Sequence, residues 1–194
     1  MAKNPTHNTS KTHIADLVYV LEKLGVQRVM LSPGSRSAPL VIALERSEGI
    51  ECVTITDERC AAFFALGVAV ARGEAVGMVC TSGSAPLNYS PALAEAFYQH
   101  VPIIALTADR PNEWIDQGEN QSINQIGIYS NFIKASFQLP AEVHTQADRW
   151  YASRMVSQAI NTSLRAPKGP VHINIPLREP LYDLAPYDLT LIHI

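Results

Sequence analysis

The sequence of 194 residues has few cysteines, little excess charge and no long hydrophobic run. Its three cysteines, Cys52, Cys60 and Cys80, form no CxxC pair and stand among apolar neighbours, so we interpret them as core residues. A formal net charge of -3 offers no basic face for nucleic acid. The longest apolar stretches, such as 61–71, fall far short of the ~20 residues of a membrane span. We therefore expect neither nucleic acid nor a membrane among the partners.

The first twelve residues are polar and lack the apolar core of a secretory signal, so we expect a cytoplasmic protein. A composition of 47% hydrophobic and 17% charged residues allows a sizeable core and has none of the marks of disorder. The length fits one large domain. The segment from Arg178 to Ile194 has little pattern and resembles a linker cut short.

Short apolar segments alternate with segments of helical periodicity along most of the chain. The expected strands cover 26–31, 52–56, 76–81, 102–107, 135–139 and 171–175. The expected helices cover 14–24 (with Ser10 as N-cap and Gly25 as stop), 39–48, 59–72, 90–100 and 147–164. Fully apolar strands separated by helices indicate a parallel sheet with both faces covered. We predict an α/β fold, a doubly wound and mostly parallel sheet of about six strands with about six helices, whose ligands bind at the carboxyl ends of the strands.

Polar residues follow the first expected strand in the loop 32–37, SPGSRS. A glycine turn, the hydroxyl of Ser35 and the guanidinium of Arg36 bring several anion-binding groups together. From this loop alone, an anion site and a capped turn with a solvated arginine are equally supported.

The run Asp57-Glu58-Arg59 separates the second expected strand from an apolar helix. Acidic residues complement the macrodipole at a helix N-terminus, and that explanation suits Asp57. It suits Glu58 less well if the preceding strand is central in the sheet, because Glu58 would then point into the ligand crevice. We therefore take Glu58 as the candidate catalytic carboxylate, suited to proton exchange.

The turn TSGSA at 81–85 contributes free backbone amides but matches no common glycine motif. It lacks GxGxxG, which disfavours a nicotinamide-dependent oxidoreductase, and it lacks the phosphate loop GxxxxGK[ST]. It also differs from the nucleophile elbow GxSxG, so serine hydrolase chemistry is disfavoured.

The polar loop 109–124 is long for a compact α/β domain, which favours a functional role. We favour anion binding by Arg110 over simple pairing with Asp109. Gln121 is equally suited to binding a substrate and to capping the following helix.

Together these stretches resemble the N-terminal domain of thiamin diphosphate enzymes, above all the menaquinone-pathway branch of that family. The matching segments cover almost the whole chain and are SPGSRSAPL, TDERCAAFFALGVA, TSGSA, LTADRPNEWIDQGENQSINQ and VHINIPLREPLY. The resemblance implies a pyrimidine-binding domain over 1–180, with 181–194 starting a linker to central and C-terminal domains. Ala38 and Ser84 replace threonines common in the family, and both changes are small.

The resemblance also implies a role for each candidate residue. Glu58 would hydrogen-bond N1' of the cofactor's aminopyrimidine ring and so promote loss of the thiazolium C2 proton, with Ser82 and Gly83 as further cofactor contacts. The implied substrate-binding residues are Ser35, Arg36, Arg110 and Gln121. The implied reaction is decarboxylation of 2-oxoglutarate and addition of the remaining four-carbon unit to isochorismate, and both substrates carry two carboxylates that arginines suit.

One family motif is missing, because no GDG occurs in the sequence. We therefore expect no metal ligands in this chain and place those of Mg²⁺ and of the cofactor diphosphate in another domain. The family's active site lies between subunits, which implies a homodimer or homotetramer and a chain that is inactive alone. The alternative is a stand-alone dicarboxylate-binding or regulatory module on the same fold.

Overall fold

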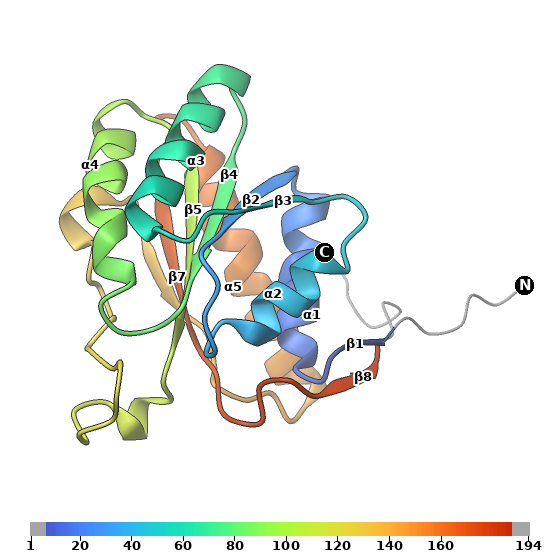
Figure 1. The fold of residues 1–194 in the computed structure, drawn as a ribbon. Coiled ribbons are helices and arrows are strands. Elements are labelled where there is room, and N and C mark those ends of the chain that lie inside the picture. Colours follow the sequence, from blue (N-terminus) through green and yellow to red (C-terminus); the bar gives the residue numbers. More distant parts are fainter. Residues whose placement is uncertain (1–6, 188–194) are drawn as a thin grey trace, which may run out of the picture.

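A six-stranded sheet in which every pairing is parallel forms the centre of the computed structural model, which describes residues 7–187 (Figure 1). The strand order is β3-β2-β4-β5-β7-β6. The strands are β2 (Arg28–Leu31), β3 (Glu51–Thr54), β4 (Val76–Cys80), β5 (Ile103–Asp109), β6 (Ser136–Gln138) and β7 (Val171–Pro176). This confirms the predicted parallel α/β sheet. Because β2 lies between β3 and β4, the chain reverses direction across the sheet there, which places the ligand crevice at the carboxyl ends of β2 and β4.

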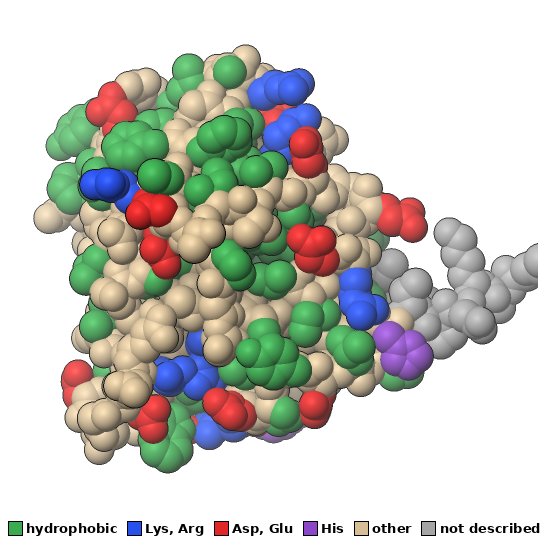
Figure 2. All heavy atoms as spheres, in the orientation of Figure 1, with side chains coloured by type: hydrophobic (Ala, Val, Ile, Leu, Met, Phe, Trp, Pro, Cys, Tyr) green, Lys and Arg blue, Asp and Glu red, His purple; other side chains and the backbone are tan. Residues whose placement is uncertain are grey.

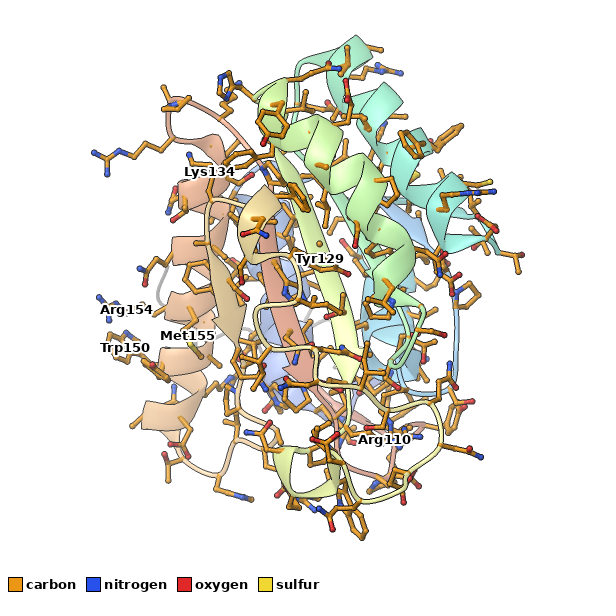
Figure 3. The ribbon with its side chains drawn as sticks, turned by 90° about the vertical axis from the view of Figure 1, so that its left-hand side faces the viewer. Arg110, Tyr129, Lys134, Trp150, Arg154 and Met155 are labelled. Atoms are coloured by element: carbon orange, nitrogen blue, oxygen red, sulfur yellow. The ribbon has the colours of Figure 1, made fainter. Side chains whose placement is uncertain are left out.

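Helices cover both faces of the sheet (Figure 1). The described residues form five α-helices, one fewer than expected, and three short 3-10 helices. The α-helices are α1 (Thr12–Lys23), α2 (Ala38–Glu45), α3 (Glu58–Arg72), α4 (Ser90–Tyr98) and α5 (Gln146–Leu164). Trp150 and Arg154 project from the outward side of α5 (Figure 3). No helix in the described range 7–187 is long and apolar enough to cross a membrane.

Two hydrophobic cores lie on opposite faces of the sheet. One contains the buried residues of α1, α2 and α5, and the other those of α3 and α4. Strand β4 contributes to both, because Val79 packs in the first core and its neighbours Met78 and Cys80 pack in the second. Strands buried on both faces explain the uninterrupted apolar runs in the sequence.

The first helix begins one residue later than its expected cap allows. Ser10 is not the N-cap; Lys11 is, with no side-chain cap hydrogen bond. The backbone N–H of Ser10 donates instead to the carbonyl of Asp183, 2.8 Å away. The prediction was wrong because Ser10 continues the pairing of two strands that lie far apart in the sequence, and the local sequence does not reveal that pairing.

These two strands, β1 (His7–Thr9) and β8 (Leu184–Pro186), form a second, antiparallel sheet, which was not predicted. Beyond β8, the hydroxyl of Tyr187 donates to Asp16 in α1 at 2.7 Å. The segment expected to begin a linker therefore lies against the domain as far as Tyr187. The remaining residues of that segment, 188–194, and the polar residues 1–6 lie outside the described range.

The three free cysteines differ in burial, and the core interpretation holds for Cys80 and in part for Cys52. Cys52 is half-buried and packs against the first core, whereas Cys60 is exposed on α3. Phe63 and Phe64, which lie three and four residues further along α3, are 46% and 50% exposed on the same side of that helix. Hydrophobic side chains gather over α3 and α4 on the face seen in Figure 2. Cys60 was misplaced because α3 carries apolar residues on its outward face as well as its inward one.

Candidate functional site

Glu58 is the first residue of α3, just beyond the carboxyl end of β3, and is half-buried. Strand β3 lies at the edge of the sheet, so it is not the central strand on which the sequence argument for Glu58 depended. Asp57 is the N-cap, and its carboxylate accepts the backbone N–H of Cys60 at 2.8 Å. The helix-terminus explanation therefore accounts for Asp57, as expected. In the described part of the chain, no hydrogen bond or ion pair joins the Glu58 carboxylate to another group. Burial raises the pKa of the Cys80 thiol, with a smaller contribution from the Glu58 charge, which places this carboxylate near the end of β4.

The loops after β2 and β4 touch at the predicted crevice. A Cβ on Gly34 would lie 2.5 Å from the Cβ of Thr81, so only glycine permits this approach. The hydroxyl of Ser37 bonds to both backbone groups of Gly34, at 3.1 and 3.0 Å, and so fixes the loop. Ser35, at the tip of this loop, is exposed.

The turn after β4 holds the long loop through Gln121. The hydroxyl of Ser82 donates to the backbone carbonyl of Gln121 at 3.0 Å. Gly83 has a φ of +84°, and a Cβ there would lie 2.8 Å from the same carbonyl oxygen. The structure thus brings Ser82, Gly83 and Gln121 together through the Gln121 backbone, while the Gln121 residue itself is exposed. Gln121 does not cap a helix, because the next helical segment of the described residues begins at Ser130, and its φ of +55° is left-handed.

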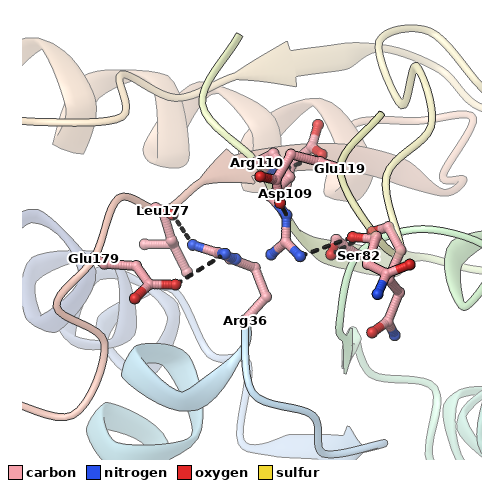
Figure 4. A network of polar contacts seen from close by, with 9 residues as sticks. Arg36, Ser82, Asp109, Arg110, Glu119, Leu177 and Glu179 are labelled. Carbon is pink, nitrogen blue, oxygen red and sulfur yellow. Dashed lines mark hydrogen bonds and ion pairs between the residues drawn. The ribbon is translucent and has the colours of Figure 1, made fainter. Parts of the chain in front are cut away.

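Arg36 and Arg110 meet in a cavity of about 240 Å³ at this end of the sheet (Figure 4). The lining residues are Arg36, Arg110, Pro111, Trp114, Glu119, Arg178 and Glu179. Arg36 is 8% exposed, and its Nη1 donates to the carbonyl of Leu177 at 2.8 Å. Burial lowers the pKa of Arg36, and the facing Arg110 lowers it further. A buried, like-charged pair of guanidinium groups attracts anions strongly.

Arg110 is held by its own loop. Its Nη2 donates to the carbonyl of Asn120 at 2.8 Å, and its Nε lies 3.7 Å from Glu119. The Asp109 carboxylate instead accepts the backbone N–H of Arg110 at 2.7 Å. Pairing between the Arg110 and Asp109 side chains, the alternative weighed for the sequence, is therefore not the arrangement found.

A third arginine of the cavity, Arg178, was not singled out from the sequence. It lies between β7 and β8 and forms ion pairs with Glu113 and, at 3.1 Å, with Glu142. The signal available was its place in the segment VHINIPLREPLY, which carries part of the family resemblance. Glu58 is not among the residues that line this cavity.

A buried polar network behind the cavity was also missed. The side chain of Gln125 accepts the N–H of Gly83 at 3.0 Å and donates to Asn174 at 2.9 Å. Asn174 in turn donates to Asp109 at 2.7 Å, and burial raises the pKa of Asp109. The network ties the turn after β4 to the ends of β5 and β7. Its signal was the presence of polar residues such as Thr107 inside otherwise apolar strands.

Over residues 7–187, no group of three or more His, Cys, Asp or Glu side chains could hold a metal ion. The described part of the chain thus offers an arginine-lined cavity for an anion and a separate, unpaired carboxylate at Glu58. It offers no cluster of carboxylates for Mg²⁺.

Comparison with known proteins gives one family match and several relatives. Residues 12–128 match the thiamine pyrophosphate enzyme, N-terminal TPP binding domain. The chain is 50% identical over 174 residues to 2-succinyl-5-enolpyruvyl-6-hydroxy-3-cyclohexene-1-carboxylate synthase of Porphyromonas gingivalis, covering 90% of the chain and 30% of the relative. It is 48% identical over 173 residues to the synthase of the same name from Desulfotalea psychrophila, covering 89% and 32%. The chain therefore spans about a third of the length of these curated relatives.

A solved structure shows the same fold. It is the thiamine diphosphate-dependent 4-hydroxybenzoylformate decarboxylase of Rhodococcus jostii RHA1, with a TM-score of 0.73 and 23% sequence identity. The match covers 85% of this chain and 30% of the decarboxylase chain. At this identity the likeness concerns the fold alone.

Proposed function

Since the chain belongs to the thiamine pyrophosphate enzyme family and matches its N-terminal cofactor-binding domain, we propose that it is part of a 2-succinyl-5-enolpyruvyl-6-hydroxy-3-cyclohexene-1-carboxylate synthase. This enzyme would decarboxylate 2-oxoglutarate and add the four-carbon unit to isochorismate in menaquinone biosynthesis. Support comes from relatives of that name at 42–50% identity over most of the chain. Residues 1–180 would form the pyrimidine-binding domain, and the segment from 181 would lead to further domains after running back along β1.

The observation that carries this proposal is the meeting of Arg36 and Arg110 in one buried cavity. Each guanidinium presents a planar set of donors to a carboxylate, so two of them suit a substrate with two carboxylates. Ser35 and Gln121, at the tips of the loops that carry these arginines, would complete the substrate contacts. A cavity of about 240 Å³ is smaller than ordinary ligand sites of about 300–1,000 Å³, which agrees with a site completed by other domains.

The Glu58 carboxylate fits the thiamin diphosphate pyrimidine, because it is half-buried at the crevice and has no partner within the described chain. When bound, the cofactor supplies a nucleophilic carbon that attacks the 2-oxo group. Glu58 would hold a proton shared with N1' of the pyrimidine, and Ser82 and Gly83 would border the ring. The donors of Ser82 and Gly83 are already used within the chain, so their part would be close contact rather than hydrogen bonding.

The remaining parts of the site would come from outside this chain. We assign the Mg²⁺ and diphosphate ligands to a further domain, since GDG is missing from the sequence and no acidic cluster occurs among the described residues. A second subunit of a homodimer or homotetramer would supply that domain. A cytoplasmic location would suit both water-soluble substrates.

Exchanging Glu58 for glutamine tests the catalytic assignment. In the full-length protein, Glu58→Gln keeps the shape of the side chain but removes its proton-accepting charge, so we expect turnover to fall at least ~100-fold. Carboligation with both substrates, thiamin diphosphate and Mg²⁺ provides the measurement, and the urea midpoint reports the fold. Asp57→Asn is the matched control, because Asp57 caps α3 and would leave turnover near the wild-type value. Near-normal turnover of Glu58→Gln would remove Glu58 from its role.

A second candidate function is a dicarboxylate-binding module that works without the cofactor. One observation favours it: none of the candidate cofactor residues Glu58, Ser82 and Gly83 is among the residues that line the arginine cavity. Calorimetry on the 194-residue chain with 2-oxoglutarate and isochorismate, with and without thiamin diphosphate, separates the two functions. Firm binding without the cofactor supports the module. Failure to bind, together with no carboligation by the isolated chain, supports the domain of a larger synthase.

A further inference from the structure

Arg36 and Arg110 each already face a carboxylate from the chain itself (Figure 4). Arg36 Nη2 lies 3.2 Å from Glu179 Oε1, and Arg110 Nε lies 3.7 Å from Glu119 Oε2. The two glutamates come from different loops, one after β7 and one after β5. Any anion that binds these arginines therefore meets groups that are chemically like its own carboxylates.

The arginines are held more firmly than the glutamates. Main-chain carbonyls fix both guanidinium groups, Leu177 for Arg36 and Asn120 for Arg110, each at 2.8 Å. The Arg36 and Arg110 side chains are 9% and 14% exposed, whereas those of Glu179 and Glu119 are 73% and 41% exposed. A distance of 3.7 Å is also too long for a hydrogen bond. Because the glutamate of each pair is exposed to water, the pair contributes little, and the glutamates can leave while the arginines stay.

The charge of the cavity points the same way. Arg178 is already paired with Glu113 and Glu142, so Arg36 and Arg110 face Glu179 and Glu119 with no excess of positive charge. A bound dicarboxylate would add two negative charges and, with both glutamates in place, would set four carboxylates against these two guanidinium groups. Burial strengthens this repulsion, so binding of a dicarboxylate favours departure of the glutamates.

We propose that Glu119 and Glu179 compete with the two carboxylates of the substrate for Arg110 and Arg36, and so set the selectivity of the cavity. The proposal rests on the proposed function. A monocarboxylate exchanges one ion pair for another and gains little. A dicarboxylate replaces both glutamates in a single binding event, so only a ligand with two carboxylates recovers both pairs at once.

The competing explanation is that the glutamates are supports that hold the arginines in the binding geometry. The two explanations predict opposite results when the charge is removed. If a glutamate competes with the ligand, its exchange for glutamine frees an arginine and tightens dicarboxylate binding. If the glutamate supports the arginine, the same exchange leaves the arginine less firmly held and weakens dicarboxylate binding.

The test uses the full-length protein with Glu119→Gln, Glu179→Gln and the double variant. Calorimetry with succinate and with propionate compares a two-carboxylate probe with its one-carboxylate counterpart, and steady-state assays give KM and kcat for both substrates. We expect about two- to fivefold tighter succinate binding in each single variant, as for loss of an exposed ion pair. In the double variant, the affinity for succinate should increase by a larger factor than the affinity for propionate. KM for at least one dicarboxylate substrate should fall with kcat nearly unchanged.

Glu48→Gln is the control, since it makes the same charge change at an exposed position outside the cavity lining. Weaker succinate binding or a fall in kcat in the cavity variants would identify the glutamates as supports and overturn the proposal. Unchanged binding, or no succinate binding by any form, would overturn it equally. If the wild-type protein shows no carboligation but the glutamate variants bind succinate more tightly than the wild type does, the proposed synthase function fails. The proposed competition between the glutamates and the ligand is then still supported.

Discussion

His172 has no exposed surface and lies in β7, the strand between β5 and β6. Its Nε2 is 2.7 Å from the hydroxyl of Thr107, and the Tyr129 ring packs edge-on against it at 4.8 Å. Burial lowers the pKa of His172 from 6.5 to about 3. The folded protein thus holds this imidazole neutral at pH values where the unfolded chain protonates it.

This difference predicts a loss of stability in acid. The contribution of His172 is complete above its unfolded pKa of 6.5 and is lost as the pH falls toward the folded pKa of about 3. At pH 5 the free energy of unfolding should be lower by about 2 kcal/mol from this residue. Urea midpoints measured from pH 8 to pH 5 should therefore fall less steeply in His172→Gln than in the wild type.

Two other histidines provide the comparison. His13 is also buried, and burial lowers its pKa to about 4, so part of the slope should remain in His172→Gln. His144→Gln makes the same exchange at an exposed position and serves as the control. Equal slopes for wild type and His172→Gln would contradict the prediction.

At the scale of single residues, the sequence identified charged groups better than it identified their partners. Arg36 and Arg110 were identified because each stands in a polar loop after an apolar strand, and the family resemblance favoured binding where the Arg36 loop alone left the choice open. Gln125 was missed, because a glutamine in a polar loop looks like its neighbours until its burial is known. Glu119 was missed for the same reason, since it looks like its neighbours in the polar loop that it shares with Arg110. Glu179 was missed because its pair with Arg36 joins loops that are far apart in sequence and leaves no local pattern.

Among the helices, α5 shows how one side chain can serve a helix end. Lys134, in the loop before β6, reaches past the last turn of α5 (Figure 3). Its Nζ donates to the carbonyls of Thr162, Arg165 and Pro167 at 2.5, 2.6 and 2.6 Å. The cation thus satisfies carbonyl groups at and beyond the negative end of the helix dipole.

Replacing this cation should destabilise the domain. Lys134→Met keeps most of the side-chain length but leaves these carbonyls without the ammonium, and we expect a loss of about 1–3 kcal/mol in the free energy of unfolding. Urea unfolding of the 194-residue chain measures this loss. Lys168→Met, at an exposed position three residues beyond Arg165, should change stability by less than about 0.5 kcal/mol. A similar small effect at both lysines would show that the contacts of Lys134 contribute nothing.

The long elements were predictable because each carries its own periodic pattern and, in α3, its own end signals, with Asp57 as N-cap and Gly73 as C-cap. Strands β1 and β8 were not predicted, because three residues are too few to show alternation. Their pairing depends on a partner at the far end of the chain. Cys60 was predicted to be buried for a related reason. The sequence pattern shows that α3 is apolar on its outward face, but it does not show whether another part of the molecule covers that face.

At the scale of the whole molecule, Asp16 joins segments that are far apart in sequence. Its carboxylate is fully buried in α1 and accepts two hydrogen bonds from Arg149 of α5, at 2.5 and 2.7 Å. The hydroxyl of Tyr187 donates to the same carboxylate at 2.7 Å. One side chain therefore holds the first helix, the last helix and the segment beyond β8 together.

We expect Asp16→Asn to be among the more damaging single changes in the chain. Breaking a buried ion pair from one side costs about 3–5 kcal/mol, so the urea midpoint should fall sharply. Glu142→Gln removes a carboxylate from an exposed pair with Arg178 and should cost less than about 1 kcal/mol. Comparable effects of the two changes would show that the Asp16 pair does not hold the domain together.

The pairing of β1 with β8 also has a consequence for synthesis on the ribosome. His7–Thr9 leave the ribosome first among the described residues, but their partner Leu184–Pro186 begins 175 residues after Thr9 (184 − 9). At about 5–20 residues per second, the earliest strand waits on the order of ten to forty seconds with its backbone groups unpaired. The central sheet can assemble in that interval, so the small sheet closes a domain that is already built. The rate of translation between β1 and β8 thus governs how long the unpaired edge of β1 is exposed to other nascent chains.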